Sequence, residues 1–101
     1  MIEITVWNRV NKKILFEAKT RSWVKAVRMA HEAEVPLTYC NFAFAKFKNG
    51  TIKDVDFSHS IFVAAEFDHV KFINCNFTDC DCYKLKIKEA LYTNCKNIPD
   101  I

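Results

Sequence analysis

The chain has 101 residues and a net charge of +3; half of the residues are hydrophobic, and only one Gly and two Pro occur. This length suits one small domain, and the composition argues against a linker-rich or disordered chain. No apolar run approaches a membrane span and the N-terminus lacks the apolar core of a signal peptide, so we expect a cytoplasmic protein with no membrane partner.

Residues 1–34 predict a cap made of two strands and a helix. Residues 2–7 alternate well enough for a strand, residues 8–13 contain turn formers, and residues 14–18 indicate the returning strand. Ser22 is the predicted N-cap of a helix over residues 23–34, which Pro36 would stop. We expect Trp7, Trp23 and Met29 to pack inside the cap. The predicted apolar stripe of the helix is Trp23, Ala26, Val27, Ala30 and Ala33.

The rest of the chain follows a register of five residues. Phe occurs at 62, 67, 72 and 77, a spacing that fits neither a helix nor a half-buried strand. Counting in fives from 37 to 97, twelve of thirteen positions are apolar or aromatic, and the positions two residues earlier are nearly all small. If each unit turns the chain by about 90°, four units close a coil of twenty residues, and coils stack at about 4.8 Å. The register therefore predicts a solenoid.

The units AKFKN, VDFSH, AEFDH, VKFIN and CNFTD resemble the pentapeptide-repeat family, over roughly residues 35–97. The resemblance implies a mainly β fold, a right-handed quadrilateral β-helix of about three coils with an N-terminal β-hairpin plus α-helix cap. The predicted division is a cap over 1–34, the repeats over 35–97 and a tail over 98–101. The cap followed by short repeats is similar to small family members that phages and prophages encode.

The five cysteines fit the register better than they fit a metal site or disulfides. Cys40, Cys75, Cys80 and Cys95 occupy the small inward column, and Cys82 occupies a central position. We expect reduced thiols in the core, with Cys75 and Cys95 as stacked neighbours. No CxxC pair, GxSxG elbow or Gly-rich phosphate loop occurs, so we expect no enzyme, no catalytic residue, no metal and no cofactor.

Two outward faces are candidate interfaces. One is apolar, and either contacts a partner or is covered by the N-terminal hairpin. The other is acidic, and the resemblance to family members that imitate DNA implies partial DNA mimicry there. A third side alternates Lys and Asp/Glu between coils, which we interpret as structural. The apolar face is predicted to contain Phe44, Ile61, Val63 and Tyr83, and the acidic face Asp54, Asp56, Asp79 and Asp81.

We therefore expect a non-enzymatic protein-binding module. The resemblance implies a phage- or mobile-element-encoded inhibitor of a host nucleic-acid-handling protein, of the anti-CRISPR or topoisomerase-binding type, in the bacterial cytoplasm. One alternative is direct nucleic-acid binding through the basic cap. Another is a self-associating structural module that forms a homodimer. The residues expected for nucleic-acid contact are Arg9, Lys12, Lys13, Arg21, Lys25 and Arg28.

Overall fold

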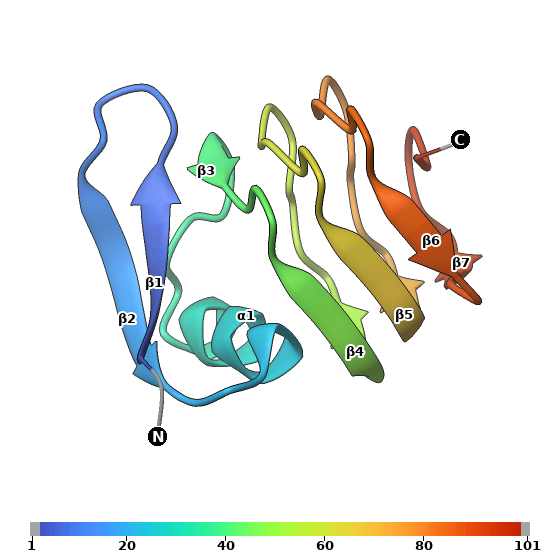
Figure 1. The fold of residues 1–101 in the computed structure, drawn as a ribbon, viewed down its shortest axis with the longest axis horizontal. Helices are drawn as coiled ribbons and strands as arrows, with labels where there is room; N and C mark the ends of the chain where they lie inside the picture. The colour runs from blue at the N-terminus through green and yellow to red at the C-terminus, as the bar shows by residue number, and fades with distance from the viewer. Residues whose placement is uncertain (1–2, 100–101) are drawn as a thin grey trace.

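The computed structural model describes residues 3–99, which begin with a β-hairpin and a helix. Strands β1 (Glu3–Asn8) and β2 (Ile14–Lys19) pair antiparallel, with a register shift between Val6 and Trp7. Helix α1 (Trp23–Glu32) follows and lies between the hairpin and the repeats (Figure 1). The predicted order of strand, strand and helix is confirmed.

The ends of helix α1 have clear local causes. The Ser22 side chain accepts the N–H of Lys25 at 3.1 Å, which confirms it as the N-cap. The helix ends earlier than predicted, at Glu32, and Glu34 has a positive φ of 60° and donates its N–H to the His31 carbonyl at 3.0 Å. Pro36 is therefore not what stops the helix.

The buried side of helix α1 differs in part from the predicted stripe. Ala26, Val27 and Ala30 are buried as expected, and Val24 is buried although it was not predicted. Ala33 is exposed, because it is the C-cap residue, where the chain leaves the helix. The predicted place of Ala33 in the stripe is wrong.

The repeats contribute five strands, and the parallel pairings among them share one offset. They are β3 (Cys40–Asn41), β4 (Lys46–Lys53), β5 (Glu66–Ile73), β6 (Lys86–Lys88) and β7 (Leu91–Thr93). Every parallel pair in the repeats joins residues twenty apart, as in Phe47↔Phe67 and Phe67↔Ile87. Isolated bridges with the same offset connect residues 41, 61 and 81, and residues 56, 76 and 96. The fold is mainly β, and its four ladders are compatible with a β-helix.

The core is a stack of aromatic rings. Each Phe from 42 to 77 in the register is at most 2% exposed, which confirms that Phe62, Phe67, Phe72 and Phe77 point inward. Phe42 and Phe62, twenty residues apart, stack with ring centroids 5.1 Å apart, whereas Phe47 and Phe67 meet edge to face. Fully burying one such ring contributes about 1.5–3 kcal/mol. Later centres such as Tyr92 are only partly buried, since no described strand stacks beyond them.

The second residue after each centre forms a corner with a left-handed backbone. From 44 to 94 these residues have φ between 51° and 63°. Asn and Asp tolerate this conformation best among non-Gly residues, and five corners use them: Asn49, Asp54, Asn74, Asp79 and Asn94. The corner residues are thus partly selected by backbone geometry.

The residues of the small inward column, two positions before each centre, also form hydrogen bonds. Side chains in this column donate to the carbonyl oxygen 23 residues earlier, as Ser60 does to Leu37 at 3.0 Å and Cys80 to Phe57 at 3.1 Å. Cys75 and Cys95 do the same toward Ile52 and Phe72. Cys and Ser suit this column because they are small and can satisfy a buried carbonyl.

Candidate protein-contact surface

All four residues of the predicted apolar face lie together. We call the outward side chains of residues 41–44, 61–64 and 81–84 face A. Backbone hydrogen bonds hold its strands in register, from the Phe44 N–H to Val63 at 2.9 Å and from the Ala64 N–H to Tyr83 at 2.8 Å. Phe44 is 73% and Tyr83 66% exposed, whereas Ile61 and Val63 are half-buried.

The hairpin does not cover face A. Strand β1 pairs edge to edge with β3, through Trp7↔Asn41 and Asn8↔Cys40. The sheet order is β2-β1-β3, and bridges continue it from Asn41 to Ile61 and Asp81. The hairpin therefore extends the sheet that carries face A, and the alternative in which it folds over this face is wrong.

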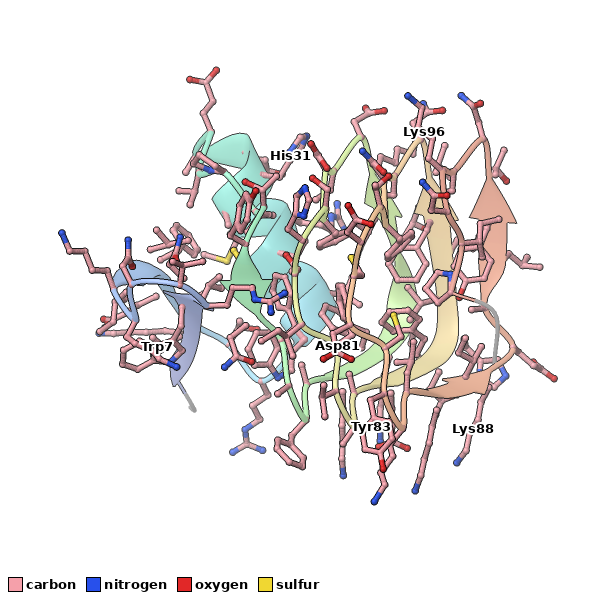
Figure 2. The ribbon with its side chains drawn as sticks, turned by 90° about the horizontal axis from the view of Figure 1, so that it is seen from above. Trp7, His31, Asp81, Tyr83, Lys88 and Lys96 are labelled. Carbon is pink, nitrogen blue, oxygen red and sulfur yellow. The ribbon has the colours of Figure 1, made fainter. Side chains whose placement is uncertain are left out.

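Trp7 belongs to this surface rather than to the interior of the cap. It is 42% exposed, and its strand partners are Asn41 on one side and Ile14, 50% exposed, on the other. Side chains directly opposite in adjacent strands point to the same side of a sheet. Trp7 and Ile14 therefore extend face A. Trp7, Asp81 and Tyr83 lie in the lower half of Figure 2, opposite His31 and Lys96.

The predicted packing role holds for only one of the three large cap residues. Trp23 packs against Phe42 and Phe47, with ring centroids 6.0 and 5.9 Å apart. Trp7 and Met29 are exposed. The strand period of two already separates Trp7 from the fully buried Val6, and this signal could have placed Trp7 outside.

Phe44 combines exposure with an unfavourable backbone. It occupies a left-handed corner with φ of 63°, where a bulky residue costs roughly 1–2 kcal/mol relative to Gly. Its ring lies outside the buried core. An exposed aromatic ring at a strained position contributes little to folding, which favours a role in contact with another molecule.

The acidic residues do not form one row. The side that precedes face A along the chain carries Asp56, and Asp54 is at the corner where this side begins. Asp79 is at the corner between this side and face A. Asp81 is on face A itself, bridged to Ile61. The four carboxylates are exposed but are divided between two sides of the stack.

Each of these carboxylates also has a partner within the chain. The Asp56 and Asp81 carboxylates accept the N–H two residues later, at 2.9 and 3.2 Å, and so shape their own turns. Asp54 accepts from the Asn74 amide at 3.0 Å, and Asp79 lies 3.8 Å from His59. The structure therefore gives these residues local roles that DNA mimicry does not require.

The six basic residues of the cap fall into two groups. Arg9, Lys12 and Lys13 are at the hairpin turn, and the Arg9 guanidinium donates to the His59 carbonyl at 2.9 Å. Arg21, Lys25 and Arg28 are at the other end of β2, roughly 20 Å away for a strand of six residues. The cap does not gather them into one patch.

A groove of about 430 Å³ between α1 and the repeats carries both signs of charge. Arg28, His31 and Lys53 line it together with Glu32 and Asp54. Mixed charge of this kind attracts phosphate weakly, so the groove adds little to the case for nucleic-acid binding.

The side that follows face A shows the predicted alternation of charges. Lys46 and Glu66 are 3.8 Å apart on paired strands. His69 contacts both Asp68 and Glu89, and the hydrogen bond with Asp68, followed by the Glu89 charge, raises the pKa of His69. The same hydrogen bond lowers the pKa of Asp68. The Lys46–Glu66 and His69–Glu89 pairs connect neighbouring coils.

All five cysteines are free thiols, in agreement with the sequence. The Cys75 N–H lies 3.5 Å from the Cys95 sulfur, so these two are stacked neighbours as predicted. Burial raises the pKa of the Cys40 and Cys80 thiols to about 12 and those of Cys75 and Cys82 to about 11. Such thiols are poor nucleophiles at neutral pH.

Residues 3–99 contain neither a metal-binding cluster nor a membrane-spanning helix. No cluster of three or more His, Cys, Asp or Glu side chains is arranged to hold a metal ion. Within the same range, no helix has the length and apolar content to cross a membrane.

Comparison with known proteins identifies the repeats. Residues 40–79 match the family described as pentapeptide repeats, in eight copies. No curated protein and no solved structure matches the chain. The matched segment contains strands β3 to β5 and the first seven Phe centres of the stack. The chain therefore contains pentapeptide repeats over residues 40–79.

Proposed function

We propose that this protein is a non-enzymatic protein-binding module, a right-handed quadrilateral β-helix of about three coils that uses face A as its contact surface. The twenty-residue offset of all four ladders supports this architecture. The filled aromatic core leaves the outward side chains as the groups available for recognition.

One observation carries the proposal: a surface of three strands and two bridged segments exposes three large aromatic side chains. Trp7, Phe44 and Tyr83 are 42%, 73% and 66% exposed. Large contiguous apolar patches are rare on monomeric proteins, and aromatic residues are enriched at protein interfaces and their hot spots. A rigid sheet presents such side chains with little loss of conformational entropy on binding.

The target class follows from the resemblance to small phage-encoded family members. We take the target to be a host nucleic-acid-handling protein, inhibited in the bacterial cytoplasm by a phage- or mobile-element-encoded chain of the anti-CRISPR or topoisomerase-binding type. Asp79 borders face A and Asp81 lies on it, and their carboxylates add partial DNA mimicry to an otherwise apolar contact.

A pull-down from bacterial lysate tests this function. The wild type is compared with Phe44→Asp/Tyr83→Asp and with the control Leu91→Asp, which alters a 61% exposed residue on another ladder. We expect the double variant to lose the partner and the control to retain it. Equal recovery by all three proteins would exclude face A as the contact surface.

A further inference from the structure

We propose that a second copy of this chain closes face A in the free protein, through a twofold axis parallel to the stacking direction. The inference rests on the proposed function, because it takes face A to be the contact surface. It names the partner that occupies this surface when no target is present.

The first argument is the distribution of charge across face A. Each segment of face A enters at one edge of the face and leaves at the opposite edge. In the last coil, Asp79 and Asp81 lie at the edge where the chain enters. Lys84 is at the corner that ends the face, and Lys86 follows it. All four side chains are exposed. In this last coil, face A is therefore apolar in its middle, acidic at one edge and basic at the other.

This arrangement is self-complementary for one orientation of two copies. A twofold axis along the stacking direction turns each strand around but keeps its level in the stack. The acidic edge of one copy then lies over the basic edge of the other, and two equivalent Asp81–Lys84 contacts form. An axis along the strands would instead keep each edge on its own side, so it would not produce this pairing.

The apolar side chains match in the same orientation. Ile61 faces Ala64 of the second copy, so a large residue meets a small one. Trp7 lies one strand beyond Asn41 and comes beside Phe44 of the second copy. Tyr83 lies between the two edges, which brings the two Tyr83 rings together near the axis. Two sheets pack about 10 Å apart, a distance that such side chains fill.

A stable contact would have to use the whole of this surface. A standard interface takes roughly 800 Å² from each partner, about one eighth of the 6165 Å² that the chain exposes. Face A with Trp7 and Ile14 spans three strands and two bridged segments, roughly 19 Å along the stack. A target protein then has to compete with the second copy, so dilution of the protein favours target binding.

Light scattering over a concentration series tests the inference. We expect the wild type to show the mass of a dimer at roughly 100 µM and to dissociate on dilution. Phe44→Asp/Tyr83→Asp is expected to be monomeric throughout, while Leu91→Asp dimerises like the wild type. A monomeric wild type at every concentration overturns the proposal, and so does a dimer that survives the double substitution.

Charge exchange tests the twofold arrangement itself. Asp81→Lys and Lys84→Asp each place like charges at both symmetric contacts, and each is expected to raise the dimer Kd by about tenfold. The double exchange Asp81→Lys/Lys84→Asp recreates opposite charges and should restore much of the affinity. A folded double exchange that stays as weak as the single variants would reject this arrangement.

Two controls keep the outcomes separate. Asp81→Asn retains an acceptor for the Tyr83 N–H and removes only the charge, so it isolates the electrostatic contribution from the turn. Thermal unfolding of every variant reports whether it is folded. If the wild type is monomeric but Phe44→Asp/Tyr83→Asp loses the lysate partner, the dimer is rejected and the proposed function stands. If the wild type is a dimer but Phe44→Asp/Tyr83→Asp still recovers the lysate partner, target binding through face A is rejected and the dimer stands.

Discussion

Gly50→Ala is expected to loosen the contact between helix α1 and the first coil. Gly50 lies in strand β4 with a negative φ, so backbone conformation does not require Gly there. A Cβ atom at this position would lie only 2.6 Å from the Val24 Cγ1 atom and 3.3 Å from its Cβ. Other repeats carry Ala in the same column, at 45, 65 and 90, so the strand itself accepts the substitution.

The magnitude follows from the stiffness of the contact. The Val24 methyl must retreat by about 0.8 Å to reach the 3.4 Å of ordinary contact. Val is β-branched and has one strongly preferred rotamer in a helix, so the helix has to move with it. Overpacking of this kind costs about 1–3 kcal/mol, partly offset by about 0.4–1 kcal/mol from the lower entropy of the unfolded chain. For a domain of this size, a net loss of 1 kcal/mol lowers Tm by roughly 4–8 °C.

A double-mutant cycle in urea or heat measures the effect. Val24→Ala alone should destabilise by about 2 kcal/mol, because it removes two buried methyl groups. In Gly50→Ala/Val24→Ala the new methyl occupies the vacated space, so the double variant should be more stable than the sum of the single effects by about 1–2 kcal/mol. A coupling energy within about 0.5 kcal/mol of zero would refute the close approach of α1 to β4.

Three further measurements probe the core, the coil-to-coil ion pairs and the thiols. Phe62→Ala should cost about 3–5 kcal/mol in unfolding free energy, since this ring is fully buried among other Phe rings; a loss under about 1 kcal/mol would contradict the aromatic stack. The raised pKa of His69 means that its stabilising contribution is full below the unfolded value of 6.5 and is lost as pH rises through the higher folded pKa. Tm of the wild type should therefore fall over this pH range more than Tm of His69→Asn. Parallel pH profiles of the two proteins would contradict a stabilising role for the His69 contacts. A thiol reagent should find five thiols in denatured protein but react slowly with Cys40 and Cys75 in native protein, and rapid native labelling of both would show that the core is open.

The repeat architecture could be predicted from the residues alone because its cause is local. Each unit needs one large inward side chain, here Phe62 or Phe67, and one small one, here Ser60 or Ala65. The same requirement recurs every five residues, so period and burial can be read directly. The corner residues follow similarly, because Asn and Asp at positions such as 49 and 54 suit a left-handed backbone.

The contents of face A could be predicted only in part. Phe44, Ile61, Val63 and Tyr83 share a position in the twenty-residue coil, so their proximity is a consequence of the period. Trp7 and Ile14 are outside the repeats, and no period connects them to residues 41 and 61. Their place depends on the edge of β3 to which the hairpin pairs.

The sequence by itself determined the twenty-residue offset, the four ladders and the inward or outward direction of each repeat side chain, because these depend on short-range geometry. Only the tertiary structure decided how the cap joins the coil. Val24 meets Gly50, strand β1 extends β3 instead of covering face A, and Trp7 becomes part of the same surface as Phe44 and Tyr83. The contacts between the cap and the repeats depend on the shapes of the two parts and on which strand edges are left unpaired. The residue pattern of either part alone does not show these features.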